Sequence, residues 1–147
     1  MATGGTSVSG RRKGTIFLAR DTDGVRMAAA GISKSYLIGA DTDVGYTFDT
    51  PVRITRLSWQ VSSQTADAGA TVTINVSKGT EATVVYTSGA LDIASDATVE
   101  TGSDTTAASE ALSNFSTSDD LIVVADFASL ATAECDICVQ VDFEYAD

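Results

Sequence analysis

Apolar and polar residues alternate most regularly near the end of the chain, between residues 136 and 145. The apolar positions are Ile137, Val139, Val141, Phe143 and Tyr145. A period of two over ten residues is typical of a β-strand with one face on a core and the other facing outward. A helix would scatter these side chains around its axis, and β-branched and aromatic residues suit a pleated surface. The pattern therefore predicts a closing strand.

Shorter patterns of the same kind precede it and predict further strands. Their ranges are 36–38, 46–48, 52–61, 70–77, 82–87, 121–127 and, inside a Ser- and Thr-rich segment, the neighbourhoods of 92–99 and 111–115. The sequence Lys78-Gly79-Thr80-Glu81 predicts a hairpin turn between two of these strands. The run from Leu121 to Phe127 is largely apolar, which predicts a strand covered on both faces.

The pattern changes phase inside the longest of these expected strands. Val52 and Ile54 share one parity, whereas Leu57 and Val61 share the other. An extra residue in the ladder shifts the following side chains by one position and returns both sets to the same face. We therefore expect a β-bulge or a bend near Thr55-Arg56.

Seven to nine short strands, without a helix of useful length, predict an all-β protein. An antiparallel β-sandwich is the natural architecture, and a jelly roll is the favoured arrangement. A chain of 147 residues suits a single domain. We place this domain at residues 35–147. Residues 1–34 are expected to form an extended N-terminal arm, because the first 14 residues are mostly small and polar with a basic cluster.

Charge is divided unevenly along the chain. Residues 1–56 hold eight of the nine basic residues and five acidic ones (net +3), whereas residues 57–147 hold one basic and 15 acidic residues (net −14). A basic arm can steer docking onto an acidic partner. The candidate partner-binding residues are Arg11, Arg12, Lys13, Arg20 and Arg26. A solvated leader whose charges only aid solubility remains an alternative, and nucleic acid is not an expected partner because an acidic body repels phosphate.

Neither export nor membrane insertion is expected. No apolar run of signal-peptide length follows Met1. The longest strongly apolar run, Leu121 to Ala125, is far shorter than the roughly 20 residues that span a bilayer. The sequence therefore predicts a soluble protein made in the cytoplasm without a signal peptide.

Cys135 and Cys138 have the CxxC spacing of redox and metal sites. Three residues apart on a strand, their side chains face opposite sides and their Cα atoms lie about 10 Å apart, beyond the reach of a disulfide. Zinc would need two more soft ligands, and the chain has no histidine and no further cysteine. We expect two unlinked thiols, buried or half-buried.

Two clusters of aspartate invite a calcium interpretation. They are Asp21-Thr22-Asp23-Gly24, and Asp41-Thr42-Asp43 with Gly45 and Asp49. A complete calcium loop needs further ligands and a glutamate at its twelfth position, which neither cluster has. Turn formation is the favoured role of these residues.

Catalytic chemistry finds little support in the sequence. Without histidine, Ser-His-Asp and Cys-His nucleophile systems are absent. A glycosidase-type carboxylate pair has no specific signal, since any two of 20 acidic residues could be chosen. Trp59 could stack on a sugar, but it shares the parity of Leu57 and Val61, which favours a place in the core. No catalytic residue, cofactor site or metal site is predicted, and the protein is not expected to be an enzyme.

The segment Leu112–Val124, LSNFSTSDDLIVV, combines a strand, a turn ending in aspartate and an apolar strand. Together with the polar arm, the Thr-, Ser- and Ala-rich strands and the alternating closing strand, it resembles structural proteins of tailed-phage virions. The resemblance is to capsid decoration, or cement, proteins with a jelly-roll domain. It implies a homotrimer on the capsid surface, with an arm along the major capsid protein, after synthesis in the host cytoplasm.

Three hypotheses of function differ in kind. A virion decoration protein predicts no catalysis, a homotrimer, and an arm that orders only on the capsid. A tail-fibre or head-fibre module that recognises host-surface glycans predicts an exposed aromatic or polar pocket. An enzyme of the jelly-roll kind predicts a metal or paired-carboxylate site, which the missing histidine makes hard to build. We rank the hypotheses in this order.

Overall fold

The computed structural model describes residues 12–21, 34–40, 43–63, 69–93, 99–128 and 135–146. Most of these residues are in strands. The strands are β2 (Lys13–Asp21), β3 (Lys34–Ile38), β4 (Val52–Ser63), β5 (Thr71–Lys78), β6 (Val84–Asp92), β7 (Val99–Asp104), β8 (Asn114–Phe115), β9 (Leu121–Ala128) and β10 (Cys135–Tyr145). A short helix, α1 (Glu110–Ser113), precedes β8.

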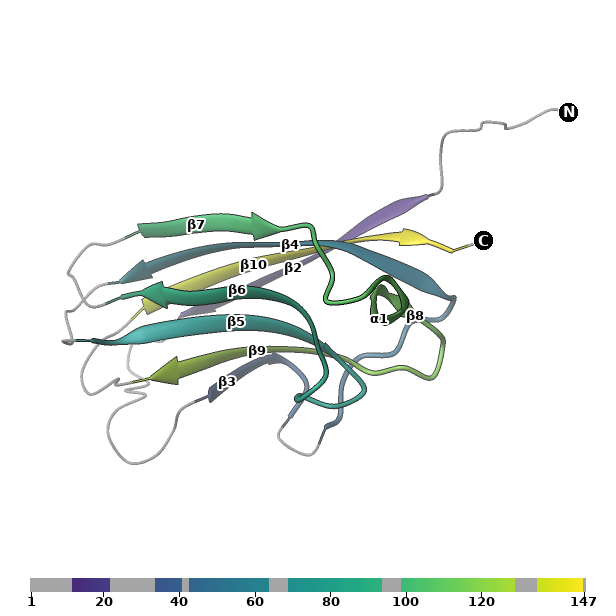
Figure 1. Ribbon diagram of the computed structural model, residues 1–147, viewed down its shortest axis with the longest axis horizontal. Helices are drawn as coiled ribbons and strands as arrows, with labels where there is room; N and C mark the ends of the chain where they lie inside the picture. Colours follow the sequence, from purple (N-terminus) through teal and green to yellow (C-terminus); the bar gives the residue numbers. More distant parts are fainter. Residues whose placement is uncertain are drawn as a thin grey trace, which may run out of the picture.

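The strands form two antiparallel sheets that pack face to face (Figure 1). Sheet I has the order β2-β10-β4-β7, with β8 paired to one end of β4, and sheet II has the order β3-β9-β5-β6. If β8 is set aside, sheet I contains the first, eighth, third and sixth strands in chain order, and sheet II the second, seventh, fourth and fifth. This is the strand order of a jelly roll, and the predicted all-β sandwich is confirmed.

The closing strand predicted from the alternation is β10, which lies inside sheet I. It pairs with β2 on one side and with β4 on the other. Ile137, Val139 and Val141 are buried, whereas Cys138 and Gln140 are half-buried on the opposite face. β2 begins and β10 ends at the same end of the molecule (Figure 1).

The predicted β-bulge is present in β4. Asp142 of β10 lies opposite Arg56, and Phe143 lies opposite Ile54, so Thr55 is the extra residue. Thr55 Oγ1 donates a hydrogen bond to the backbone oxygen of Asp142 at 3.2 Å. Because of this insertion, Ile54 is buried together with apolar residues of the other parity.

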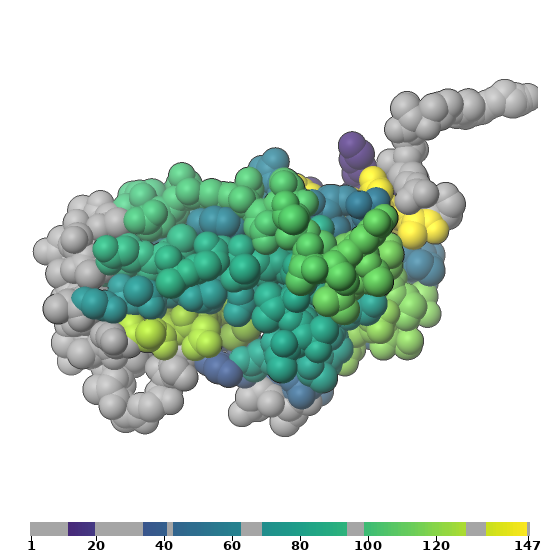
Figure 2. Space-filling model, viewed as in Figure 1, coloured from purple at the N-terminus to yellow at the C-terminus, as the bar shows by residue number. Residues whose placement is uncertain are grey.

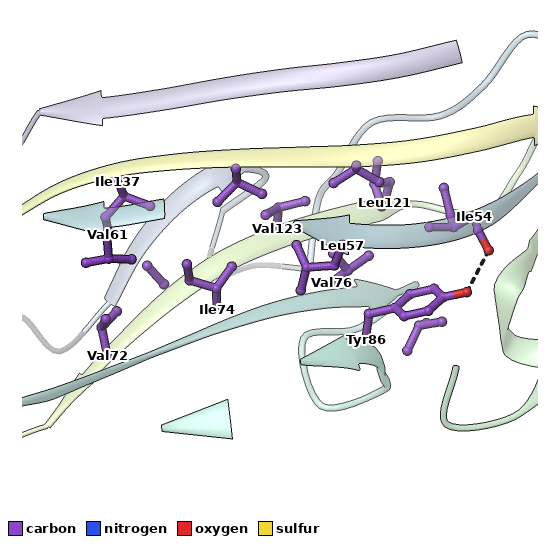
Figure 3. Packing of buried hydrophobic residues seen from close by; sticks show 14 of the residues in the cluster. Ile54, Leu57, Val61, Val72, Ile74, Val76, Tyr86, Leu121, Val123 and Ile137 are labelled. Carbon is purple, nitrogen blue, oxygen red and sulfur yellow. Dashed lines mark hydrogen bonds between the residues drawn. The ribbon is translucent and has the colours of Figure 1, made fainter. Parts of the chain in front are cut away.

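Tyr86 of β6 joins the two sheets beside the bulge (Figure 3). Its hydroxyl donates to the backbone oxygen of Ile54 at 2.8 Å within the core. Burial raises the pKa of Tyr86, so the hydroxyl stays protonated and remains a donor. Strand periodicity does not reveal this link, because it depends on a carbonyl at a local break in the ladder.

β9 is buried on both faces, as its apolar run predicts. Leu121 and Val123 belong to the core between the sheets. Ile122 and Val124 point the other way and are 0% and 1% exposed. The loop after β3 lies close to Ile122, because a Cβ built on Gly45 would be only 3.0 Å from Ile122 Cγ1.

Three strand expectations differ from the structure. Residues 46–48 form no strand, and Tyr46 makes only an isolated bridge with Leu121. Instead of a strand at 92–99, β6 runs on to residue 92 and β7 starts at residue 99, while 94–98 lie outside the described residues. The stretch 111–115 begins in α1, because the Ser109 side chain caps this helix by accepting from Leu112 N at 3.2 Å.

Sheet I also begins earlier in the chain than the expected domain boundary at residue 35. Residues 13–21, which fall in the expected arm, pair with β10 as edge strand β2. Ile16 and Leu18 pack against the core, and the ring of Phe143 lies over Gly14, where a Cβ would come within 2.4 Å of Phe143 Cζ. Residues 1–11 and 22–33 lie outside the described residues, so their assignment to an arm stays a prediction.

Candidate functional site

The outer face of sheet I is a broad surface of small polar side chains, which we call the open face. Strand register places on it Thr15, Phe17 and Ala19 of β2, Cys138, Gln140 and Asp142 of β10, Arg56, Ser58 and Gln60 of β4, and Val99, Thr101 and Ser103 of β7. All of these residues are exposed or half-buried. Two large apolar side chains stand out among the hydroxyls and amides, Phe17 with 66% and Val99 with 57% of their surface exposed.

A charged network occupies one end of the open face, beside the bulge. Asp142 Oδ1 accepts hydrogen bonds from Thr15 Oγ1 and Gln140 Nε2, both at 2.9 Å. Arg56 Nε lies 3.7 Å from Asp142 Oδ2 and donates to Ser58 Oγ at 2.7 Å. These contacts join β2, β10 and β4, so the network holds the strands and fixes the side chains around a depression of about 390 Å³.

A second depression lies nearer the middle of the open face. Its volume is about 220 Å³, and its lining includes Phe17, Ser58, Gln60 and Gln140. An aromatic ring can cover the apolar face of a small ligand, while amides and a hydroxyl can exchange hydrogen bonds with it. This combination suits a neutral polar ligand such as a sugar.

On sheet II, by contrast, the main polar cluster holds the fold. The Glu81 carboxylate pairs with Lys34 and accepts a hydrogen bond from Tyr36 Oη at 2.6 Å. Glu81 N donates to Asp43 Oδ1 at 2.9 Å. The hydrogen bonds from Lys34 and Tyr36, the former being the larger cause, lower the pKa of Glu81. The cluster fastens the turn after β5 to β3 and to the loop that follows β3.

The structure describes two of the five predicted partner-binding side chains. The Arg12 guanidinium lies 4.7 Å from the centroid of the Tyr145 ring, and Lys13 lies opposite Glu144 at the start of β2. Figure 2 shows the start of β2 beside the last residues of the chain. Arg20 belongs to β2, but its side chain is outside the description.

Arg11 and Arg26 lie outside the described residues. The structure therefore places Arg12 and Lys13 at one end of sheet I, and the partner-binding role of all five residues stays a prediction.

The two cysteines have the predicted geometry. Cys135 is buried, Cys138 is half-buried on the open face, and neither forms a disulfide. Asp43 has a φ of 58° and its backbone N–H donates to Ala40 O at 3.2 Å, as in a turn, while its carboxylate accepts from Glu81 N. Within the described ranges, no group of three or more Cys, Asp or Glu side chains could hold a metal ion.

Trp59 packs against the core, as its parity predicts. Its indole lies over Gly102 of the neighbouring strand β7, where a Cβ would come within 2.7 Å of Trp59 Cζ2. Trp59 is therefore no exposed stacking platform. The exposed aromatic residue that sequence reasoning missed is Phe17, because it lies in the segment expected to be an arm.

Comparison with known proteins finds no family model that matches the chain and no curated protein with significant similarity to it. The described part of the chain contains no helix with the length and apolar character that a membrane span requires.

Proposed function

We propose that this chain is a non-enzymatic structural protein of a phage virion, which binds the outside of the capsid as a homotrimer. The observation that carries the proposal is the open face, a wide polar surface bounded by the edge strands β2 and β7. A surface of this kind suits docking on another protein more than it suits chemistry on a small substrate. Jelly rolls are common in viral capsid proteins, which supports the proposal by analogy alone.

Charge also supports docking on an acidic partner at one end of the sheet. Arg12 and Lys13 lie where β2 begins, and Arg11 precedes them in the chain. Association guided by such a cluster weakens as salt screens it, over ionic strengths where the Debye length shrinks from about 10 Å to 3 Å. The proposed partner is the major capsid protein.

The test compares phage capsids with and without the protein by cryo-electron microscopy and by co-sedimentation. Because Lys13 and Gly14 belong to β2, the informative truncation removes residues 1–11 only. We expect this truncated protein to fold, to bind capsids more weakly, and to lose part of the salt dependence. Full-length protein that leaves no density on the capsid surface and does not co-sediment would overturn the proposal.

A second candidate function is recognition of host-surface glycans by a fibre module. The depression beside Phe17, with its amides and hydroxyl, is the observation that favours it. Screening the protein on a glycan array, with Phe17→Ala as the test variant, measures this function. Val44→Ala removes another exposed apolar side chain elsewhere and serves as the control. Binding that is lost in the first variant and retained in the second supports the glycan module.

A further inference from the structure

The two lateral sides of the sandwich carry opposite charge. One side is formed by β2 and β3, and the other by β7 and β6. In sequence, the first pair of strands contains Lys13, Arg20 and Lys34 against Asp21, with Lys34 already paired to Glu81. The second pair contains Asp92, Glu100 and Asp104 with no basic residue. A basic side and an acidic side on one molecule are complementary between two copies.

Each edge strand of sheet I also presents an exposed apolar side chain. Among the described residues, the exposed large hydrophobic residues are Phe17, Val44, Tyr46 and Val99. Phe17 lies on β2 and Val99 on β7, and both point to the open face. Figure 2 shows β7 along one rim of the molecule, beside β6. Unpaired strand edges of this kind are templates for pairing with another chain.

The direction of the strands permits such pairing. β2 is antiparallel to β10, β10 to β4, and β4 to β7. β2 and β7 therefore run in opposite directions. A second copy can be placed beside the first with its strands along the same direction. Its β2 then runs antiparallel to β7 of the first copy, so the antiparallel pattern of the sheet continues.

We infer that copies of this chain associate side by side, with β2 of one copy adding to β7 of the next, so that sheet I continues across the contact. In the antiparallel register that sets Phe17 opposite Val99, Arg12 lies opposite Asp104 and Gly14 lies opposite Gly102. The contact thus joins an apolar pair, and two glycines meet where the edges approach. It also sets the Arg12 cation opposite the Asp104 carboxylate, which already accepts from Thr87 N and Thr106 N at 3.0 Å. Cross-strand pairs of this kind stabilise antiparallel sheets.

The contact joins two different surfaces of the chain, β2 of one copy and β7 of the next, so it is head-to-tail and not two-fold. Repeating it produces a ring when the rotation closes. A two-fold contact between two β2 strands would bury Phe17 but leave Val99 and the acidic edge uncovered. The inference rests on the homo-oligomer of the proposed function and supplies its interface.

The test uses light scattering after size exclusion on the full chain and on variants of the exposed positions. Val99→Arg places a cation on the acidic edge, and Phe17→Glu places an anion on the basic edge. We expect each variant to shift the protein from trimer to monomer, with at least a tenfold weaker association. The double variant carrying both changes recreates an opposite-charge pair in the stated register and should recover the trimer. Val44→Arg is the matched control, because Val44 is as exposed as Val99 but lies outside both edges.

Each outcome decides the inference. A monomeric full chain overturns it, as does Val99→Arg protein that associates like the parent, or a double variant that stays monomeric. If the parent protein is a dimer, and Phe17→Glu abolishes association while Val99→Arg does not, the contact is the two-fold contact between two β2 strands instead. Capsid co-sedimentation of the same variants separates the two proposals. Single copies bound to capsids would contradict the edge contact and support the capsid-binding function. Rings that do not bind capsids would support the edge contact and contradict the capsid-binding function.

Discussion

The outer faces of the two sheets differ although both sheets have four main strands in the same sandwich. On sheet II, Ile122 and Val124 are buried on the side away from the core, and the Glu81 cluster fastens a turn and a loop there. On sheet I, the corresponding face carries hydroxyls, amides and the exposed ring of Phe17. β9 of sheet II therefore has apolar side chains buried on both of its sides, whereas the strands of sheet I present one side to the surroundings.

This difference locates the part of the molecule available for binding. Side chains that already pack under a loop, as Ile122 of β9 does, offer little surface to a partner without loss of stability. Residues on an exposed polar face can be substituted at small cost to the fold, because substitutions of surface residues usually alter the free energy of unfolding by less than about 0.5 kcal/mol. Such a face can therefore be adapted to a partner. Function on sheet I and stability in sheet II should thus respond to different mutations.

The strongest test of this contrast truncates an apolar residue on each outer face. Ile122→Ala should lower the free energy of unfolding by about 2–5 kcal/mol, because it opens a cavity on sheet II. Phe17→Ala on sheet I should change it by less than about 0.5 kcal/mol. Urea denaturation followed by circular dichroism measures both. Equal losses in the two variants would show that the open face is also part of the packed structure.

A smaller effect is expected where the two sheets are joined. Tyr86→Phe removes the hydroxyl that reaches Ile54 and leaves a buried backbone oxygen without its donor. The expected loss is about 1–3 kcal/mol of unfolding free energy. Tyr36→Phe serves as control, since Tyr36 donates to the partly exposed Glu81 and should cost less. If the control costs as much as Tyr86→Phe, the link between the sheets has no special role.

The edges of sheet I should tolerate change better than its centre. Gly102→Ala places a Cβ into the ring of Trp59, which can shift at the edge of the sheet, and we expect a loss of about 1 kcal/mol. Ser103→Ala, an exposed neighbour, controls for the change in strand propensity. A thermal melt of both variants provides the comparison. A wild-type melting temperature for Gly102→Ala would show that the ring is not confined there.

The smallest effect concerns pH and sheet II. The pKa of Glu81 lies below its ordinary value of 4.5, so the stability that its ionised form provides is present above that pH and is lost as pH falls through the lowered pKa. Glu81→Gln should be less stable than the parent at pH 7 by less than about 1 kcal/mol, because the pair is partly exposed. The difference should disappear at low pH. Denaturation of both proteins at pH 7, 5 and 3 measures it, and a constant difference would assign the effect to packing.

Sequence patterns predicted the sandwich well because burial imposes a period on the strands. The alternation of β10, the apolar run of β9 and the phase change at Thr55 all follow from which side chains must meet the core. β2 was missed because its alternation is short and follows a polar segment. Its partner is β10, at the far end of the chain, where for example Gly14 lies against Phe143, 129 residues away in sequence.

Contacts between side chains could not be predicted from sequence patterns where the two partners are far apart in the chain. Nothing local to Tyr86 reveals that its hydroxyl meets Ile54, and nothing local to Glu81 reveals Lys34 and Tyr36. The exposed position of Phe17 became visible only once β2 was placed at the edge of the sheet. The arrangement of surface residues into a face thus required the strand register.

The position of Trp59 gives the molecule a built-in optical reporter. It is the only tryptophan in the chain, its indole lies over Gly102 at the β7 edge, and Nε1 is buried with no hydrogen-bond partner among the described residues. Its emission wavelength depends on how much water and how many dipoles surround the indole. A partner that changes the packing of this indole against β7 can therefore be followed by intrinsic fluorescence, without a label and without altering the surface under study.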